Sequence, residues 1–491
     1  MRVRVTDFLI YRWRYIVSYG FLIVCVGLVL FVASFYVPGE LREAELTSSV
    51  QSGSLSIKSL SPSMVIDLPY HVLQRVIFNI FGVSTFTIKL PSLILGVGTV
   101  LGLFLLLSTW FRRNVAVFGT IIAVTSTQFL FLVQDGTPGI MHTFVAVWLL
   151  FAATYVTRQK LFGTLWKVIT LVLIGTALYL PLGSYLVLAI LTTSLFHPHI
   201  RHIIKRFSRL RFILAIVLGC IAITPLIYAS ILDPGVARTL LGIPDHSIDF
   251  WRNTTQVGTD IAGFASQSTS ALVRPLYSLS IVLLAGIGLY KLITYKYTAR
   301  SYITMVWGAL LIPLIILNPE RVTETFPLAA LLMSLGIATL ISDWYKLFPR
   351  NPYARVAGLI PLTIVIIGIM SLSVLRYIGN YQYNSSILSF YSKDLTLLRR
   401  QLTNLKSTSS NTILYAGPSE AAFYTLVAHY DKRFSVDRSF TASNQIVIVA
   451  HDARTHIPPR TELKEIVTNS RATDSNRFYI YQPQSRISPN R

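Results

Sequence analysis

The chain has 491 residues, of which 53% are hydrophobic and only 13% are charged, and its mean hydropathy is +0.58. Soluble domains carry about 25% charged residues, so this composition excludes an ordinary soluble protein and indicates a polytopic membrane protein. The net charge of +22 is compatible with either a nucleic-acid partner or a membrane topology signal, and the placement of the basic residues distinguishes the two. Cys25 and Cys220 both lie in apolar runs, so no disulfide framework is expected.

Apolar runs long enough to cross a bilayer recur along residues 1–378. A hydrocarbon core roughly 30 Å thick needs about 20 apolar residues per helix. No small-residue cleavage site follows the first run, which is therefore predicted to be a retained anchor. Pro181 and Gly183 leave open whether a tight turn or a kink separates two of the runs. The sequence predicts eleven spans, near residues 16–37, 90–110, 115–134, 138–157, 163–178, 180–196, 210–231, 273–295, 301–317, 324–342 and 356–377.

The basic residues gather in loops that alternating spans place on one side of the membrane. This is the pattern of the positive-inside rule, and it predicts a cytoplasmic N-terminus in a plasma-membrane protein. The charge is thus a topology signal, with attraction to anionic membrane lipids as a further consequence, and no nucleic-acid partner is expected. The basic clusters fall at residues 2–14, 112–113, 158–160, 197–211, 291–300 and 346–355.

Acidic residues concentrate on the opposite side. The first outer loop begins with "PGELREAEL", which sets Glu40, Glu43 and Glu45 within six positions of a chain that has only 21 acidic residues. Solvation of a long loop is one explanation for this cluster. Chemistry on the outer face of the membrane is the other.

Two outer segments are long, residues 38–89 and 232–272. In the first, "IDLPYHVLQRVIFNIFGV" places Val72, Val76 and Ile80 at helical spacing, which predicts an amphipathic helix at the membrane interface, too short to span.

The composition becomes polar after the last predicted span. There the strand-like stretches "NTILYAG", "NQIVIVAH" and "RFYIYQP" bracket the helix-like "SEAAFYTLVAHY", and another helix is expected around residues 391–406. We predict a membrane-embedded domain over residues 1–378 and a small extracytoplasmic α/β domain over residues 379–491.

The first part of the chain has a recognisable order of motifs. The acidic outer loop is followed by "LPYHVLQRVIFNIFGVSTFTIKLPSLILGVGTVLGLFLL", a basic turn, and "VAVFGTIIAVTSTQFLFLVQDGTPGIMHTFVAVWLL". Over roughly residues 15–160 this resembles the C-type-fold membrane glycosyltransferases, specifically the superfamily of protein O-mannosyltransferases and aminoarabinose transferases. The resemblance implies transfer of a sugar from a polyprenyl-phosphate lipid to a hydroxyl of a protein, lipid or glycan on the outer face.

The resemblance also implies where the acids of such a site lie. The superfamily has an Asp-Glu pair just beyond the first span, with the Asp as base; here Arg42 stands in place of the Asp and Glu43 matches the Glu. Glu40, three residues earlier, lies on the same face if the segment is helical and is then a candidate substitute, and Glu45 is a third candidate. At the outer end of the third span Asp135 matches the acid of the second position, although capping of the next helix explains it equally.

The donor phosphate requires cationic groups. Arg321, in "NPERVTETF", matches the arginine of a Pro-Arg-Tyr segment and is the candidate for the donor phosphate; the alternative is an interfacial arginine paired with Glu320 or Glu324. Lys89, His71 and Arg274 are further candidates. No cofactor is certain, and a divalent metal held by Glu43 and Asp135 is an alternative. Because Arg42 replaces the superfamily Asp, a catalytically inactive homologue that binds lipid-linked glycans or acts as a scaffold is the alternative function.

Overall fold

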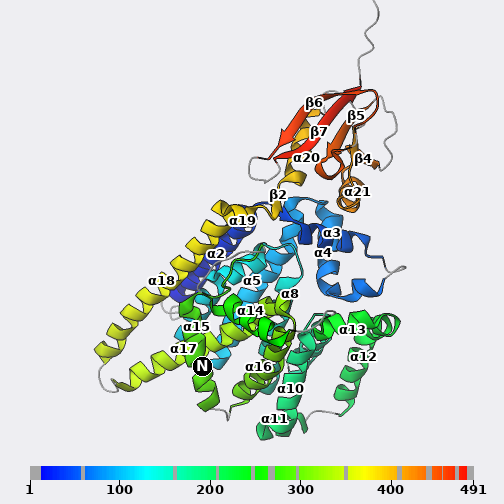
Figure 1. Cartoon of the computed structure of the whole chain (residues 1–491). Helices are drawn as coiled ribbons and strands as arrows, with labels where there is room; N and C mark the ends of the chain where they lie inside the picture. Colours follow the sequence, from blue (N-terminus) through cyan, green and yellow to red (C-terminus); the bar gives the residue numbers. More distant parts are fainter. Residues whose placement is uncertain are drawn as a thin grey trace, which may run out of the picture.

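The structure is a computed structural model of the whole chain (Figure 1). It describes residues 13–56, 61–158, 163–205, 209–244, 249–263, 271–294, 298–347, 352–405, 412–437, 445–455, 457–469 and 475–483. Several residues of the predicted basic clusters, including residues 2–12, lie outside this described part.

The protein is mostly helical, and a helix or a bent pair of helices lies at each of the eleven predicted spans. The helices at these places are α2 (Trp13–Phe35), α5 (Thr85–Trp110), α6 (Arg113–Thr125) with α7 (Thr127–Gln134), α8 (Gly139–Arg158), α9 (Gly163–Leu178), α10 (Gly183–Phe196), α12 (Arg209–Leu232), α15 (Leu279–Thr294), α16 (Ala299–Leu317), α17 (Phe326–Leu347) and α18 (Pro352–Tyr383).

Not all of these helices are long enough to cross a bilayer alone. Within the described residues, five helices have the length and apolarity of a span, or seven if each bent pair is one span. Shorter apolar helices lie at 23–35, 163–178, 183–196 and 279–294. The count of eleven spans therefore stays a prediction. Between α9 and α10 the chain makes a turn at residues 179–182, with Leu182 in the left-handed region at φ 60°, so the sequence alternative of a mere kink does not apply.

The third predicted span is bent by 62° between α6 and α7. Ser126 has extended backbone angles, and its side chain accepts a hydrogen bond from the Phe129 amide, which caps a new helix at this point. The bend directs the end of α7 towards the segment that follows α2, where Asp135 pairs with Arg42. A local capping signal thus positions a candidate site residue.

Close contact between α15 and α17 holds the helical part together. Gly288 and Gly336 face the backbone carbonyls of Leu332 and Leu284, respectively, at distances that leave no space for a Cβ atom. Small residues at such crossings let helix backbones approach closely where lipid provides no hydrophobic driving force.

The predicted amphipathic helix is present as α4 (Leu68–Phe81). Its apolar residues Val72, Val76 and Ile80 are exposed, whereas Tyr70 and Gln74 on the opposite face are buried. An exposed apolar stripe agrees with a position at the membrane interface, which the sequence predicts. The other elements between the apolar helices are β1 (Leu41–Arg42), α3 (Glu43–Ser54), η2 (Pro62–Val65), α11 (Pro198–Lys205), α13 (Pro234–Leu241), α14 (Phe250–Ala262) and η3 (Pro319–Thr325).

A small five-stranded sheet follows α18, in the order β4-β3-β5-β7-β6. Strands β3, β4 and β5 are parallel, and β7 is antiparallel to both β5 and β6. Strands β3, β5 and β7 and helices α20 and α21 correspond to the predicted elements, whereas β4 and β6 were not predicted. The elements are α19 (Ser385–Leu388), β2 (Tyr391–Ser392), α20 (Asp394–Leu405), β3 (Thr412–Tyr415), α21 (Ala421–Tyr430), β4 (Phe434–Asp437), β5 (Ile446–Ala450), η4 (His451–Ala453), β6 (Thr461–Thr468) and β7 (Asn476–Pro483).

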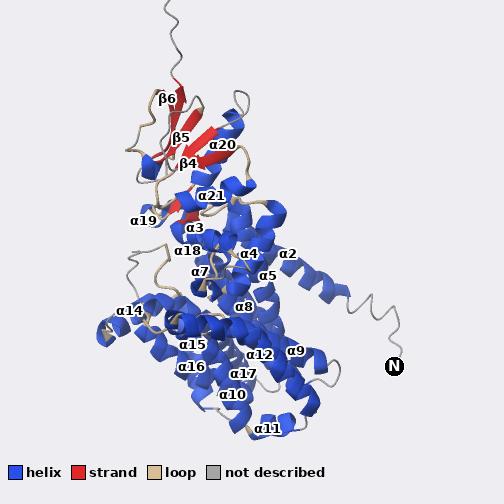
Figure 2. Cartoon of the chain, turned by 90° about the vertical axis from the view of Figure 1, so that its right-hand side faces the viewer, coloured by secondary structure: helices blue, strands red, loops and turns tan. Residues whose placement is uncertain are grey.

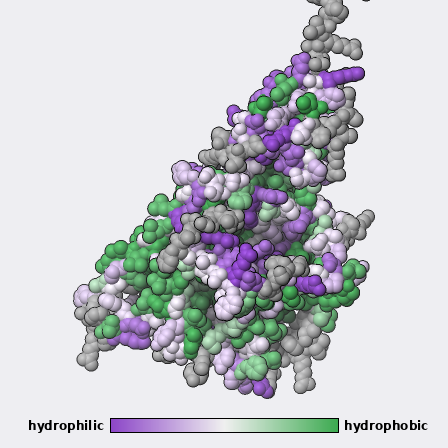
Figure 3. Space-filling model, viewed as in Figure 1, coloured by the Kyte–Doolittle hydropathy of each residue, from purple (hydrophilic) through white to green (hydrophobic). Residues whose placement is uncertain are grey.

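The sheet lies at one end of the helical part, beyond α3 and α4 (Figures 1 and 2). Strand β1 pairs antiparallel with β2, which ties the first outer loop to the chain entering the sheet. In Figure 3 hydrophobic residues gather on the flanks of the helical part and hydrophilic ones are denser towards the sheet. This distribution agrees with a bilayer around the helices and water around the sheet.

Candidate functional site

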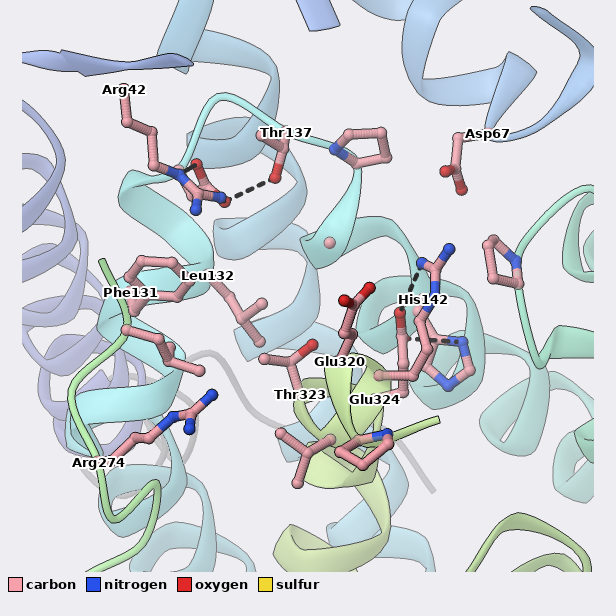
Figure 4. Close-up of a pocket in the computed structure, with 18 residues that line it drawn as sticks. Arg42, Asp67, Phe131, Leu132, Thr137, His142, Arg274, Glu320, Thr323 and Glu324 are labelled. Carbon is pink, nitrogen blue, oxygen red and sulfur yellow. Dashed lines mark hydrogen bonds and ion pairs between the residues drawn. The ribbon is translucent and has the colours of Figure 1, made fainter. Parts of the chain in front are cut away.

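A cavity of about 370 Å³ opens between the first outer loop, the turn joining α7 to α8, and η3 (Figure 4). We call it the first cavity. Three arginines and four carboxylates line it, together with His142, Thr137 and apolar residues of α7. The charged lining residues are Arg42, Asp67, Asp135, Arg274, Glu320, Arg321 and Glu324.

One end of the first cavity is a fixed ion pair between Arg42 and Asp135. The guanidinium donates to both carboxylate oxygens, from Nε to Oδ1 at 3.0 Å and from Nη2 to Oδ2 at 2.5 Å. The Thr137 hydroxyl donates to Oδ2 at 2.6 Å. Bidentate pairs of this kind fix orientation as well as charge. Asp135 Oδ1 accepts a single hydrogen bond from the described residues, which leaves it a lone pair directed to a further donor.

A second ion pair supports the first from behind. Glu45 and Lys89 are both fully buried, with 3.7 Å between Oε1 and Nζ. Glu45 also accepts hydrogen bonds from the backbone amides of Gly136 at 2.6 Å and Arg42 at 2.8 Å. One carboxylate therefore joins the two chain segments that carry Asp135 and Arg42. Gly136 is required here, because a Cβ would lie 3.1 Å from Glu45 Oε1 and 2.8 Å from Ile88. Burial raises the pKa of Glu45, whereas Lys89 opposes the shift.

Lys89 extends this network towards the terminal sheet. Its Nζ donates to Gln134 Oε1 at 3.1 Å, and Gln134 Nε2 donates to the Tyr391 hydroxyl at 3.0 Å. Four chain segments thereby fix the position at which Asp135 leaves α7.

The other end of the first cavity is more loosely built. Arg321 lies 4.0 Å from Glu324, whose second oxygen lies 3.2 Å from His142 Nδ1. Across from them, Asp67 precedes α4 in the left-handed region at φ 56° and accepts no hydrogen bond from a described side chain. Burial raises the pKa of Asp67 to about 7, with Arg321 lowering it and Glu324 raising it. Figure 4 shows the Asp67 carboxylate and Glu324 facing the same space.

Arg274 reaches the first cavity from a separate segment. It pairs with Asp260 of α14 at 3.0 Å, and about a quarter of its side chain is exposed. It therefore adds a third positive group to the lining.

The structure brings together only part of the site predicted from the sequence. Asp135 and Arg321 line the first cavity, and Lys89 lies behind its wall. Glu40 is buried and pairs with Lys393 at 3.0 Å, and Glu43 lines a different cavity. His71 is buried against the Ser52 hydroxyl at 2.8 Å, and burial lowers its pKa to about 4.

Two lining residues, Asp67 and His142, were not predicted. Asp67 opens the predicted amphipathic helix, and His142 lies inside a predicted span, where an ionisable residue is itself a functional signal. Among the described residues no group of three or more His, Cys, Asp or Glu side chains has the arrangement of a metal site, and Glu43 and Asp135 line different cavities.

Comparisons with known proteins agree with the sequence resemblance. A family model described as dolichyl-phosphate-mannose-protein mannosyltransferase matches residues 69–228. ArnT from Cupriavidus metallidurans, solved bound to undecaprenyl phosphate, is similar with a TM-score of 0.51 and 13% identity over 94% of this chain and 98% of that one. The apo state of the same protein has a TM-score of 0.50 and 13% identity over 95% of this chain and 98% of that one. The apo oligosaccharyltransferase of Archaeoglobus fulgidus has a TM-score of 0.51 and 12% identity over 86% of this chain and 65% of that one.

No curated protein matches the chain. The structural likenesses establish the C-type fold of the membrane glycosyltransferases, and with the family model they confirm the predicted resemblance. The apolar helices and these neighbours together indicate a multi-pass membrane protein.

Proposed function

We propose that the chain is an integral-membrane glycosyltransferase that moves a sugar from a polyprenyl-phosphate donor to a hydroxyl acceptor on the outer face of the plasma membrane. The observation that carries the proposal is the first cavity, where three arginines face four carboxylates beside long apolar helices. A lipid-linked sugar has the matching chemistry, because its phosphate requires cationic groups and its polyprenyl chain requires the bilayer. The undecaprenyl phosphate bound to ArnT supports this donor class.

In this proposal the two ends of the first cavity have different roles. Arg321 binds the donor phosphate, because its pairing with Glu324 at 4.0 Å leaves its hydrogen-bond donors available. Arg274 adds a positive charge from the facing wall. Asp135 orients the acceptor hydroxyl through Oδ1 and accepts its proton.

The reaction is then a displacement at the anomeric carbon. The bond from this carbon to the phosphate oxygen breaks as the bond to the acceptor oxygen forms. The phosphate leaves with the electron pair and is stabilised by the arginines, while the acceptor proton passes to the carboxylate.

The remaining predicted residues act around this centre. Lys89 holds Glu45 and Gln134, and so supports the wall rather than contacting the phosphate directly. Glu40 and His71 are engaged away from the first cavity, which favours structural roles for both. Glu43 lines a separate cavity between α3 and the unit that holds the terminal sheet.

The topology in the proposal follows the charge pattern. The chain crosses the membrane eleven times, with the bent pair α6–α7 as one crossing and with a cytoplasmic N-terminus. The unit of residues 379–491 is extracytoplasmic. This places the first cavity at the outer surface, where a lipid-linked donor is present and free nucleotide sugars are not.

The test uses the full chain in nanodiscs with a panel of radiolabelled polyprenyl-phosphate sugars, with and without EDTA. We expect sugar release from one donor, lowered about 10²- to 10⁴-fold by Asp135→Asn. Asp343→Asn, at an exposed position in the last turns of α17, is the control and should transfer normally. Donor binding without release would contradict the proposal and favour the inactive homologue.

A further inference from the structure

A second cavity, of about 800 Å³, lies between the first outer loop and the unit that holds the terminal sheet. Glu43 and Thr47 of α3 form one wall, and Glu420, Phe423 and Arg477 form the other. Residues 389–392, around β2, line the second cavity between these two walls. The second cavity has no part in donor binding as proposed above.

Arg42 is shared by the two cavities. It belongs to the lining of both, and its guanidinium is held on Asp135 at the edge of the first cavity. The Arg42 side chain therefore borders both the second cavity and the proposed reacting centre. Arg321 lines the first cavity but not the second. An acceptor arriving from the second cavity would therefore pass Arg42 and reach Asp135 without first meeting Arg321, the group proposed to bind the phosphate.

The second cavity also lies at the switch point of the terminal sheet. The neighbouring strands β3 and β5 are parallel, and the connection after β3 runs to β4 on one side whereas the connection after β5 runs to β6 on the other. In α/β sheets ligands bind beside the carboxyl ends of strands at this place. Here Asp452, after β5, joins the two loops by accepting from the Gly417 amide at 2.8 Å and the Ser419 hydroxyl at 2.9 Å.

The polar groups of this wall are held in fixed orientations. Arg477 donates to both oxygens of Asp394, at 2.8 and 2.5 Å, and lies 3.9 Å from Glu420. Burial, with Asp452 and Asp394 nearby, raises the pKa of Glu420 to about 7. A planar guanidinium next to a carboxyl provides adjacent donors and acceptors, which match neighbouring hydroxyls on a sugar ring.

An exposed aromatic ring completes the second cavity. Phe390 lines it and is 42% exposed, whereas the other aromatic residues of the lining, Tyr391 and Phe423, are buried. Aromatic faces contact the C–H face of a sugar while its hydroxyls reach polar side chains. Rings and oriented polar groups together are typical of a carbohydrate site.

We propose that the acceptor is a carbohydrate, that the second cavity binds it, and that its reacting hydroxyl passes Arg42 to reach Asp135. This assignment rests on the glycosyltransferase function proposed above. It selects a glycan hydroxyl over the hydroxyl of a protein Ser or Thr.

The first test fills the second cavity. Ala422 lines it from an exposed position on α21, so Ala422→Trp adds bulk without disturbing a core. Thr425→Trp, also exposed on α21 but outside this cavity, is the matched control. With the full chain in nanodiscs, the donor found above and a panel of oligosaccharides, Ala422→Trp should raise the acceptor KM at least tenfold. Release of donor sugar to water should stay unchanged in both variants.

The second test removes the ring. Phe390→Ala should raise the acceptor KM roughly two- to tenfold, whereas Phe81→Ala, an exposed phenylalanine at the end of α4, should not. If the wild type transfers sugar and neither Ala422→Trp nor Phe390→Ala changes the acceptor KM, the second cavity is not the acceptor site. Transfer to a Ser/Thr peptide but to no oligosaccharide would overturn the carbohydrate assignment alone. A wild type that neither transfers nor releases sugar would overturn this assignment together with the proposed function.

Discussion

The two ends of the first cavity use the same kinds of charged residue in opposite ways. At one end Arg42 and Asp135 form a bidentate pair, backed by the fully buried pair of Glu45 and Lys89. At the other end Arg321 lies 4.0 Å from Glu324. A tight pair fixes geometry but has few hydrogen-bonding positions left for a ligand, whereas a loose one keeps them. The proposed function assigns the acceptor to the fixed end and the donor phosphate to the loose end on the basis of this difference.

The largest expected effect is on the support of the fixed end. Lys89→Ala leaves the Glu45 charge buried without its partner, and we expect a loss of about 3–5 kcal/mol in unfolding free energy. Denaturant unfolding in detergent micelles measures this. Lys346→Ala breaks an exposed pair with Asp343 and is the control, with a loss below about 1 kcal/mol. Equal losses would mean that the buried network does not stabilise the fixed end.

The next effect concerns the pair itself. Arg42→Ala should cost about 3 kcal/mol in unfolding free energy, less than Lys89→Ala because about a quarter of the Arg42 side chain is exposed. The double variant with Asp135→Ala should regain part of this loss, because no carboxylate then remains unpaired. A strictly additive double-mutant cycle would argue against a coupled pair.

At the loose end the effect should fall on binding rather than folding. Arg321→Ala should weaken binding of a polyprenyl-phosphate sugar about 10- to 100-fold, the contribution of hydrogen bonds to a charged group, with a small change in unfolding free energy. Equilibrium binding in nanodiscs measures it. Arg238→Ala, in the last turn of α13 and outside the first cavity, is the control. A variant that unfolds as readily as Arg42→Ala would show that the two ends are not different.

The smallest expected effect is a pH dependence at Asp67. Its pKa is raised from 3.8 to about 7, so it is largely protonated below pH 6 and charged above pH 8. The charged form competes with an anion for Arg321, and donor affinity should therefore fall a few-fold between pH 6 and 8. The sugar phosphodiester stays singly charged over this range.

The free energy of unfolding, like the donor affinity, should fall as the pH rises. The folded state binds the Asp67 proton more tightly than the unfolded state, so its contribution is full below about pH 4 and is lost as the pH rises through 7. Asp67→Asn should weaken both dependences but not remove them, because Glu324 also lies 4.0 Å from Arg321 and burial raises the pKa of Glu420 to about 7. Asp233→Asn, a helix cap outside the first cavity, should leave both unchanged. An unchanged donor pH profile in Asp67→Asn would exclude this group.

The sequence alone determined where the apolar helices lie, because apolarity is a local property that depends only on the run of residues. The order of motifs also predicted Asp135 and Arg321 as site residues, and both line the first cavity. Strands β4 and β6 were not predicted, because the "FSVD" of β4 lacks the apolar run that marks β3, and the largely exposed "TELKEIVT" of β6 carries no apolar face.

Only the tertiary structure decided how the charges pair. Arg42 and Asp135 are 93 residues apart, and no local pattern links them. The three glutamates of "PGELREAEL" look alike in the sequence, yet the structure buries Glu45 against Lys89, pairs Glu40 with Lys393 and turns Glu43 to the second cavity. Pairing depends on distances between segments that meet only after folding. For this reason the sequence predicts an acidic loop after the first span, and only the fold determines the partner of each carboxylate.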